Sequence, residues 1–199
     1  MKFTAEQVKR LVFSDGIQLP GNLEALVACQ EDTKLPPAGT ASHYYRFFYR
    51  LFKTLRPALT LELGTSYGHS SACMADANED GLIVTVNNRD ELRQECWRKN
   101  VLYKNQDSLA VVPLEAPIDI LFIDTDHDGV RCLAEFLSYE KYMAKNSIVF
   151  FDDISLNEEM KKFWDSFNPE GWTKFELPAH GSAGFGCLIK TDDDGGVTQ

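Results

Sequence analysis

The stretch Leu59-Thr60-Leu61-Glu62-Leu63-Gly64-Thr65-Ser66-Tyr67-Gly68-His69-Ser70-Ser71 carries the strongest structural signal in this chain. It opens as a short apolar run of β character, turns at Gly64 and Gly68, and continues into residues 70–75, which read as the first turns of a helix. A strand, a tight glycine turn and a helix N-terminus form the layout of a nucleotide-type cofactor site. The two glycines let the backbone turn and approach a ligand without a Cβ clash.

The acid in this stretch argues against a dinucleotide ligand. A dinucleotide fingerprint is G-x-G-x-x-G, whereas this chain has Gly64-x-x-x-Gly68 and no third glycine. Glu62 stands beside the turn, where a carboxylate would repel a pyrophosphate and suit a cation. S-adenosylmethionine (SAM) carries an ammonium group and a sulfonium but no phosphate. The alternative is a buried strand followed by an ordinary glycine-rich turn.

This stretch resembles motif I of the class I methyltransferases, which reads acid-x-Gly-x-x-x-Gly. The resemblance implies a SAM site. The residues of this stretch that it assigns to the cofactor are Glu62, Gly64, Thr65, Ser66, Gly68 and Ser70.

The composition of the chain argues against some classes of partner and some locations. The 199 residues are enough for one α/β domain, and the formal net charge of −10 argues against nucleic acid as a partner. The apolar runs are too short for a membrane span, and no apolar core of a signal peptide follows Met1. The five cysteines form no C-x-x-C pair, which favours reduced thiols and a cytoplasmic location.

Apolar runs alternate with helical patterns along the chain. Strands are predicted at 59–63, 82–86, 101–103, 118–123 and 148–151, and helices at 69–78, 90–99 and 158–167, with another after Asp128 that has Val130, Leu133 and Leu137 on one face. Residues 171–177 and 186–190 form a closing hairpin like the last two strands of the class I methyltransferases. The prediction is a Rossmann-like, doubly wound α/β fold with a seven-stranded sheet, mostly parallel with an antiparallel C-terminal hairpin.

Three regions are expected. Residues 1–40 form an N-terminal helical extension, with helices at 4–13 and 22–31. Residues 41–190 form the methyltransferase domain, and its first helix, 41–55, is rich in aromatic residues that we expect to pack on the sheet. Residues 191–199 form a disordered acidic tail.

Two further segments bear on the cofactor. Asn87 and Asn88 end the second strand, where related folds commonly present an acid to the ribose hydroxyls; an amide can also bind a hydroxyl. Asp107 and Ser108 follow the third strand and resemble the methyltransferase segment that approaches the adenine. In each case the alternative is an ordinary polar loop.

Acidic residues end the next two strands. Asp124 and Asp126 follow the fourth strand, and Asp152 and Asp153 follow the fifth. The carboxyl ends of parallel strands share one edge, so these side chains could converge, and converging carboxylates favour a hard divalent ion such as Mg²⁺. Helix capping is the alternative for Asp152 and Asp153.

This arrangement looks like the small metal-dependent O-methyltransferases related to the macrocin and catechol enzymes. Residues 122–127 are close to the Ile-Asp-Gly-Asp-His segment of that family, with Thr125 in place of glycine. The resemblance implies Asp124, Asp152 and Asp153 as ligands of Mg²⁺ or another hard divalent cation. It implies His127 as a base or cofactor contact, and Asp124 also lies beside the cofactor.

The sequence therefore predicts transfer of a methyl group from SAM to a hydroxyl of a small molecule, with divalent-metal assistance. His127 or Asp126 would take the proton from the acceptor. A non-catalytic binding protein with the same fold and, less favoured, a dinucleotide-dependent oxidoreductase are the alternatives. The assembly state stays open, with a homodimer among the options.

Overall fold

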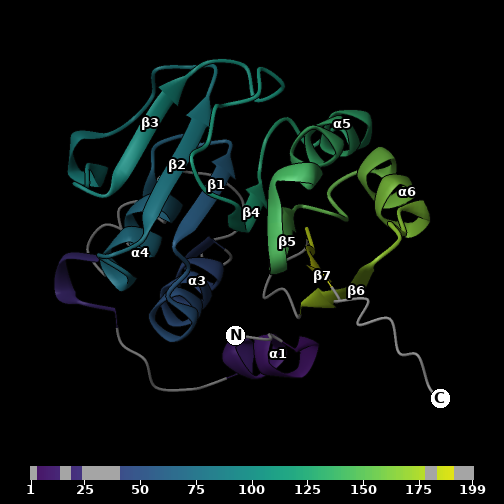
Figure 1. The fold of residues 1–199 in the computed structure, drawn as a ribbon, viewed down its shortest axis with the longest axis horizontal. Helices are drawn as coiled ribbons and strands as arrows, with labels where there is room; N and C mark the ends of the chain where they lie inside the picture. Colours follow the sequence, from purple (N-terminus) through teal and green to yellow (C-terminus); the bar gives the residue numbers. More distant parts are fainter. Residues whose placement is uncertain (1–3, 14–18, 24–40, 178–182, 191–199) are drawn as a thin grey trace.

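The computed structural model describes residues 4–13, 19–23, 41–177 and 183–190. From β1 onward most strands are separated by helices, except that β3 leads to β4 and β6 to β7 without a helix between them (Figure 1). In chain order they are α1 (Ala5–Phe13), α3 (Ala41–Leu55), β1 (Leu59–Leu63), α4 (His69–Ala77), β2 (Leu82–Asn87), the 3₁₀-helix η1 (Gln94–Cys96), β3 (Val101–Asn105), β4 (Ile118–Ile123), α5 (Gly129–Tyr139), the 3₁₀-helix η2 (Glu140–Tyr142), β5 (Met143–Asp152), α6 (Glu158–Ser166), β6 (Trp172–Leu177) and β7 (Phe185–Lys190).

The strands form one seven-stranded sheet in the order β3-β2-β1-β4-β5-β7-β6. Strands β1 to β5 pair in parallel, while β7 pairs antiparallel with both β5 and β6. From β1 the chain builds the sheet in one direction, through β2 and β3, and then returns to add β4 on the other side of β1. The strand order therefore reverses between β1 and β4. The predicted fold class is confirmed, including the antiparallel hairpin at the end of the chain.

Helices cover both faces of the sheet. The core on one face joins α1, α3 and α4 to the sheet, and the core on the other joins α5 and α6 to it (Figure 1). The aromatic residues of α3 pack as predicted: the ring of Phe48 lies 4.8 Å from that of Phe122, and the ring of Phe47 lies 5.7 Å from that of Phe150. Phe122 belongs to β4 and Phe150 to β5, so α3 is packed on the strands that end at the candidate site.

The helix predicted over 90–99 is wrong. Only Gln94–Cys96 is helical, as one 3₁₀ turn, and its flanking residues are extended. Tertiary contacts account for the difference: the Arg93 N–H donates to the Tyr67 carbonyl, and Cys96 is fully buried. The segment is therefore held by the loop before α4, and this contact replaces the hydrogen bonds that a continuous helix would make.

Two predicted segments lie at the limits of the described chain. Residues 21–23 are helical, but the rest of the helix predicted at 22–31 lies outside the described residues, as does the tail 191–199. The division of the chain into three regions therefore stays a prediction.

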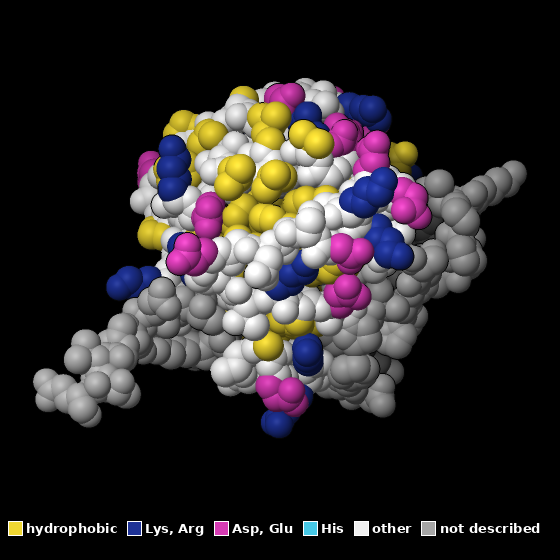
Figure 2. Space-filling model, turned by 90° about the vertical axis from the view of Figure 1, so that its right-hand side faces the viewer, with side chains coloured by type: hydrophobic (Ala, Val, Ile, Leu, Met, Phe, Trp, Pro, Cys, Tyr) yellow, Lys and Arg dark blue, Asp and Glu magenta, His cyan; other side chains and the backbone are white. Residues whose placement is uncertain are grey.

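The apolar face predicted for α5 points outward. Val130, Leu133 and Leu137 are exposed, and the side chains that face the core are instead Cys132 and Phe136. Figure 2 shows hydrophobic side chains gathered on this side of the molecule, with charged ones around them. A groove lies beside them, lined by residues of α5, α6 and the loop that follows α6. Within the described ranges, no helix combines the length and the apolar character that a membrane span requires.

Candidate functional site

The carboxyl ends of four parallel strands meet at one edge of the sheet. The register places Leu63 at the end of β1 beside Val86 on one side and Ile123 on the other, and Ile123 beside Phe151. Whatever follows these residues must therefore lie along the same edge. In open α/β sheets this edge binds ligands, at the place where the strand order reverses.

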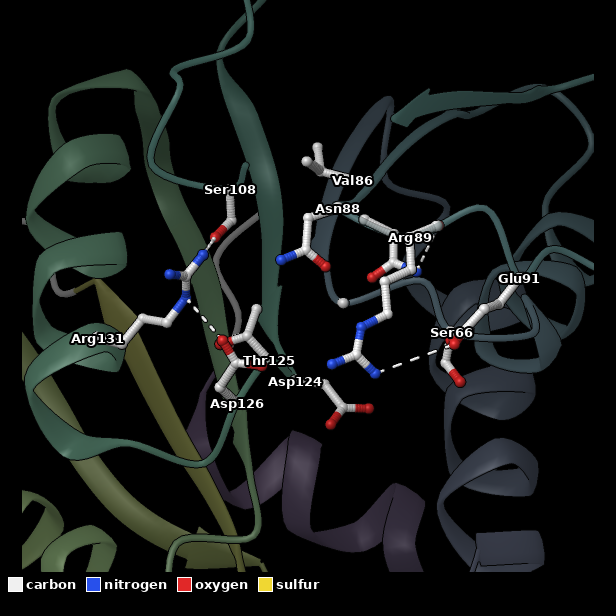
Figure 3. A pocket seen from close by; sticks show the side chains of 12 residues that line it. Ser66, Val86, Asn88, Arg89, Glu91, Ser108, Asp124, Thr125, Asp126 and Arg131 are labelled. Carbon is white, nitrogen blue, oxygen red and sulfur yellow. Dashed lines mark hydrogen bonds and ion pairs between the residues drawn. The ribbon is translucent and has the colours of Figure 1, made fainter. Parts of the chain in front are cut away.

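A cavity of about 160 Å³ opens at this place, above β1, β2 and β4 (Figure 3). Charged and amide side chains make up most of its wall. The lining residues are Gly64, Ser66, Val86, Asn87, Asn88, Arg89, Glu91, Ser108, Asp124, Thr125, Asp126 and Arg131.

The two loops that form the floor of the cavity touch at Gly64. Its φ is +102°, and a Cβ on this residue would lie only 1.6 Å from the carbonyl oxygen of Asp124. Two backbone hydrogen bonds of 2.8 Å hold the contact, from the Gly64 N–H to the Val86 carbonyl and from the Asp124 N–H to the Leu63 carbonyl. A residue without a side chain is therefore required here by both conformation and space.

Gly68 is constrained in a similar way. Its φ is +88°, and a Cβ would lie 2.6 Å from the Leu92 side chain. It precedes α4 at the N-cap position, with no side chain to cap the helix. Gly68 does not line the cavity, so its role in the structure is to let the loop turn into α4.

Glu62 is fully buried and turned away from the cavity. Its carboxyl group accepts hydrogen bonds from the hydroxyls of Ser70, Ser71 and Thr85. Burial raises its pKa, although the three hydroxyls work in the opposite direction. In the structure Glu62 ties the first turn of α4 to the sheet, and a direct contact with the cofactor, as predicted from sequence, is not part of this arrangement.

The same polar cluster contains Thr65. Its hydroxyl lies 2.6 Å from that of Thr85, so the bonds run from the buried carboxyl group to the glycine loop. Thr65 is buried and does not line the cavity, whereas the next residue, Ser66, does. Of the predicted contacts in this loop, the cavity wall contains Gly64 and Ser66.

Arg131, in the first turn of α5, links the loop that follows β3 to the loop that follows β4. Its guanidinium donates to Asp107 at 2.8 Å and to the Ser108 hydroxyl at 2.7 Å, and it lies 3.5 Å from the Asp126 carboxylate (Figure 3). It also pairs at 3.1 Å with Glu135, one turn further along α5.

Glu135 anchors this network from inside the protein. It is fully buried and accepts hydrogen bonds from Ser108, Thr125 and Arg131. Burial raises its pKa, against the effect of these partners. On the outside, Asp107 accepts the Leu109 N–H, and this bond, helped by Arg131, lowers the Asp107 pKa. Asp107 is thus held as an ionised acceptor next to the cavity, and Ser108 lines the cavity itself.

The end of β2 places amides in the cavity where related folds have an acid. Asn87 and Asn88, the residues predicted to meet the ribose, both line it. The Asn87 side-chain N–H₂ donates to the Arg89 carbonyl at 2.9 Å, which leaves its oxygen to accept from a hydroxyl.

A second group of titratable side chains lies one strand further along, at the ends of β4 and β5. His127 Nε2 is 3.3 Å from Asp153 Oδ2, and both residues have positive φ, +50° and +53°. Asp152 accepts the Asp153 N–H at 2.9 Å. Burial and the neighbouring charge of Asp153 raise the Asp152 pKa to about 8, and burial raises the Asp153 pKa against the opposing effect of His127.

The predicted metal ligands are not assembled into a metal site. Among the residues that the structure describes, no three His, Cys, Asp or Glu side chains are grouped closely enough to hold an ion. Asp153 turns to His127, Asp152 is engaged by the following N–H, and Asp124 lines the cavity above β1, β2 and β4. The strand ends do bring these aspartates to one edge, but the turn after β5 directs them to different partners.

Sequence reasoning missed five of the residues in the cavity wall, namely Val86, Arg89, Glu91, Thr125 and Arg131. One of them had a readable signal: Asp128 caps α5 through the N–H groups of Val130 and Arg131, and Arg131 stands four residues before Glu135. An arginine in the first turn of α5 can place its side chain against the end of β4, the strand that precedes this helix.

The geometry agrees with a known family. The sequence model described as "Methyltransferase domain" matches residues 61–154, which run from within β1 to just past β5 and contain the whole cavity wall. This is the class I methyltransferase fold. The resemblance predicted from the glycine stretch is thereby confirmed.

Solved structures with this methyltransferase fold match nearly the whole chain. The O-methyltransferase TomG from Streptomyces achromogenes, involved in tomaymycin synthesis and solved with SAM, has a TM-score of 0.70 at 18% identity, over 92% of this chain and 96% of that one. An SAH-bound methyltransferase from Podospora anserina has a TM-score of 0.72 at 16% identity, over 96% and 98% of the two chains. The O-methyltransferase from Bacillus cereus, in complex with SAH, has a TM-score of 0.68 at 18% identity, over 92% and 97%. No curated protein matches this chain.

Proposed function

We propose that this protein transfers the methyl group of SAM to a hydroxyl of a small molecule. The observation that carries the proposal is the cavity between the ends of β1, β2 and β4, formed by the Gly64 loop inside the region that matches the methyltransferase family. The neighbours solved with SAM or SAH share this fold, and the two named as O-methyltransferases support a hydroxyl as acceptor.

The residues of the cavity fit a ligand of this chemistry. Asp124, Asp126 and Glu91 provide carboxylates for a ligand that carries an ammonium and a sulfonium. The free oxygen of Asn87 suits a ribose hydroxyl, and Asp107 and Ser108 would meet the adenine. When bound, SAM supplies an electrophilic methyl group, so the protein has to hold the acceptor in line and remove its proton.

The His127–Asp153 pair supports a role as the base. The Asp153 carboxyl group lies 3.3 Å from His127 Nε2, where its carboxylate would stabilise the charge that the imidazole gains on taking a proton from the acceptor hydroxyl. Asp126, the other predicted base, lies 3.5 Å from the Arg131 guanidinium, so its carboxylate is already engaged in an ion pair. His127 is therefore the better base of the two.

Divalent-metal assistance stays a prediction from sequence. Asp124, Asp152 and Asp153 do not form a common binding site in this arrangement, so we derive no step through a metal. His127 supplies an acid–base group for deprotonation that depends only on side chains of the protein.

The proposal is tested first by calorimetry with S-adenosylhomocysteine and then by transfer of a labelled methyl group to a panel of sugars, catechols and other small hydroxyl compounds. We expect binding of the nucleoside and labelling of at least one acceptor. Binding without transfer to any acceptor would favour the non-catalytic alternative. Binding of NAD in place of S-adenosylhomocysteine would favour the oxidoreductase.

The remaining partner predictions follow from this function. The acceptor is a small molecule, and the formal charge of −10 continues to argue against nucleic acid. A cytoplasmic location and a homodimer remain predictions, to be measured by fractionation of cells and by sedimentation equilibrium.

A further inference from the structure

Arg89 is the weakly paired cation of the cavity. Its side chain comes from the end of β2 and points into the cavity, and its recorded ion pair, with Glu91, is long at 4.0 Å (Figure 3). The side chain is 71% exposed, whereas that of Arg131 is 22% exposed and is engaged by three carboxylates. Arg131 is thus committed to the protein, and Arg89 has donors to offer to a ligand.

An acid faces this arginine. Figure 3 shows the Asp124 carboxyl group and the Arg89 guanidinium both turned into the cavity, whose wall also contains Ser66. The guanidinium and the carboxylate come from the loops that follow β2 and β4, the strands on the two sides of β1. A positive and a negative group in the wall of one cavity match the carboxylate and ammonium of an α-amino acid.

The two serine hydroxyls at the start of α4 are already occupied and cannot donate to the carboxylate of a ligand. Ser70 and Ser71, both buried, donate to Glu62 within the protein. A hydroxyl has one proton to donate, so neither can also donate to a ligand while these bonds persist. An anionic group in the cavity must therefore take its donors from the wall itself, where the Arg89 guanidinium presents several.

We propose that Arg89 binds the α-carboxylate of the amino-acid half of SAM, with Asp124 on the side of the α-ammonium. This assignment rests on the proposed function and adds to it the residue that selects a zwitterionic ligand. The planar fork of arginine suits a carboxylate because two parallel N–H groups can meet its two oxygens. Lysine at the same place would keep the charge and lose the fork.

The test compares two nucleosides by calorimetry. S-adenosylhomocysteine has the amino-acid half, and 5′-methylthioadenosine lacks both its carboxylate and its ammonium. For Arg89→Ala we expect S-adenosylhomocysteine to bind about 10–100-fold more weakly, as for the loss of hydrogen bonds to a charged group. The affinity for 5′-methylthioadenosine should stay the same, and Arg89→Lys should lie between.

Arg56→Ala is the matched control. Arg56 is also exposed and paired with one acid, Asp80, but it precedes β1 and so lies at the opposite end of the strands. This variant should bind both nucleosides as the unaltered protein does. The thermal midpoint of Arg89→Ala should also be unchanged, because its side chain is exposed and makes one long ion pair.

The outcomes separate the two proposals. If the unaltered protein binds neither nucleoside, the proposed function fails, and the role of Arg89 fails with it. If it binds both and Arg89→Ala weakens both equally, or neither, the proposed function stands and the role of Arg89 is overturned. Tighter binding of NADP⁺ than of S-adenosylhomocysteine, lost in Arg89→Ala, would instead make Arg89 a phosphate contact.

Discussion

Alanine at position 64 would force apart the two loops that form the floor of the cavity. The added Cβ would lie 1.6 Å from the Asp124 carbonyl oxygen, and contacts below 3.0 Å essentially do not occur. One loop therefore has to retreat by about 1.4 Å. A movement of that size stretches the 2.8 Å hydrogen bonds of Gly64 to Val86 and of Asp124 to Leu63 beyond bonding distance.

The cost can be worked from these contacts. The φ of +102° is strained for a residue with a Cβ, at about 1–2 kcal/mol. Two lost backbone bonds add about 1 kcal/mol each. The free energy of unfolding should fall by roughly 3–4 kcal/mol, which lowers the thermal midpoint of a chain of this length by roughly 10 °C. Affinity for S-adenosylhomocysteine should fall as well, because the same displacement deforms the cavity.

Thermal unfolding and calorimetry measure both effects, with Gly171→Ala as the control. Gly171 has a φ of +78°, but a Cβ there would meet nothing within 4 Å. Its alanine variant carries the conformational strain without the clash, so it should lose only about 1–2 kcal/mol and keep its affinity for the nucleoside. Equal losses in the two variants, with unchanged binding in Gly64→Ala, would refute the contact between the loops as the cause.

Three further outcomes are expected. Burial and the charge of Asp153 raise the Asp152 pKa from an ordinary 3.8 to about 8, so its ionisation opposes folding and stability should decline as pH rises from about 4 to 8. Asp152→Asn should reduce this decline, measured as the free energy of unfolding in urea titrations at several pH values. A variant that follows the pH dependence of the unaltered protein would contradict this origin. His127→Gln should reduce the rate of methyl transfer by about 10²–10⁴-fold while the affinity for S-adenosylhomocysteine stays constant; a loss confined to that affinity would make His127 a cofactor contact instead. Excess EDTA should leave transfer unchanged if His127 suffices as the base, and activity that EDTA removes and Mg²⁺ restores would reinstate the metal.

The fold was largely predictable because most strands are short apolar runs, which can be recognised from the local sequence alone. Residues 118–123 and 148–151 are buried on both faces of the sheet, and such runs are typical of parallel strands. The segment 90–99 could not be predicted in the same way. Its conformation depends on a backbone bond from Arg93 to Tyr67, a contact that no local pattern encodes.

The site was predictable as a place and less so as a set of contacts. Topology alone brings Gly64, Asn87 and Asp124 to one cavity, because they follow strands that share an edge. The direction in which a side chain points was not available from sequence. Asp153 turns to His127 because its backbone adopts a φ of +53°, and this removes it from the predicted metal cluster.

Glu62 and Asp124 are both acids near this edge of the sheet, but their surroundings give them different roles. Glu62 is in β1 and Asp124 follows β4, the neighbouring strand, and both were predicted to meet the cofactor. Glu62 points into the face covered by α4, where three hydroxyls satisfy it, so its effect on a ligand passes through the position of the glycine loop. Asp124 lies past the end of its strand, in the cavity wall, where a cationic ligand can reach it. A charged ligand at this site would therefore be bound at the ends of β2 and β4, by Arg89 and Asp124, while the acid of the glycine motif serves to hold the loop between them.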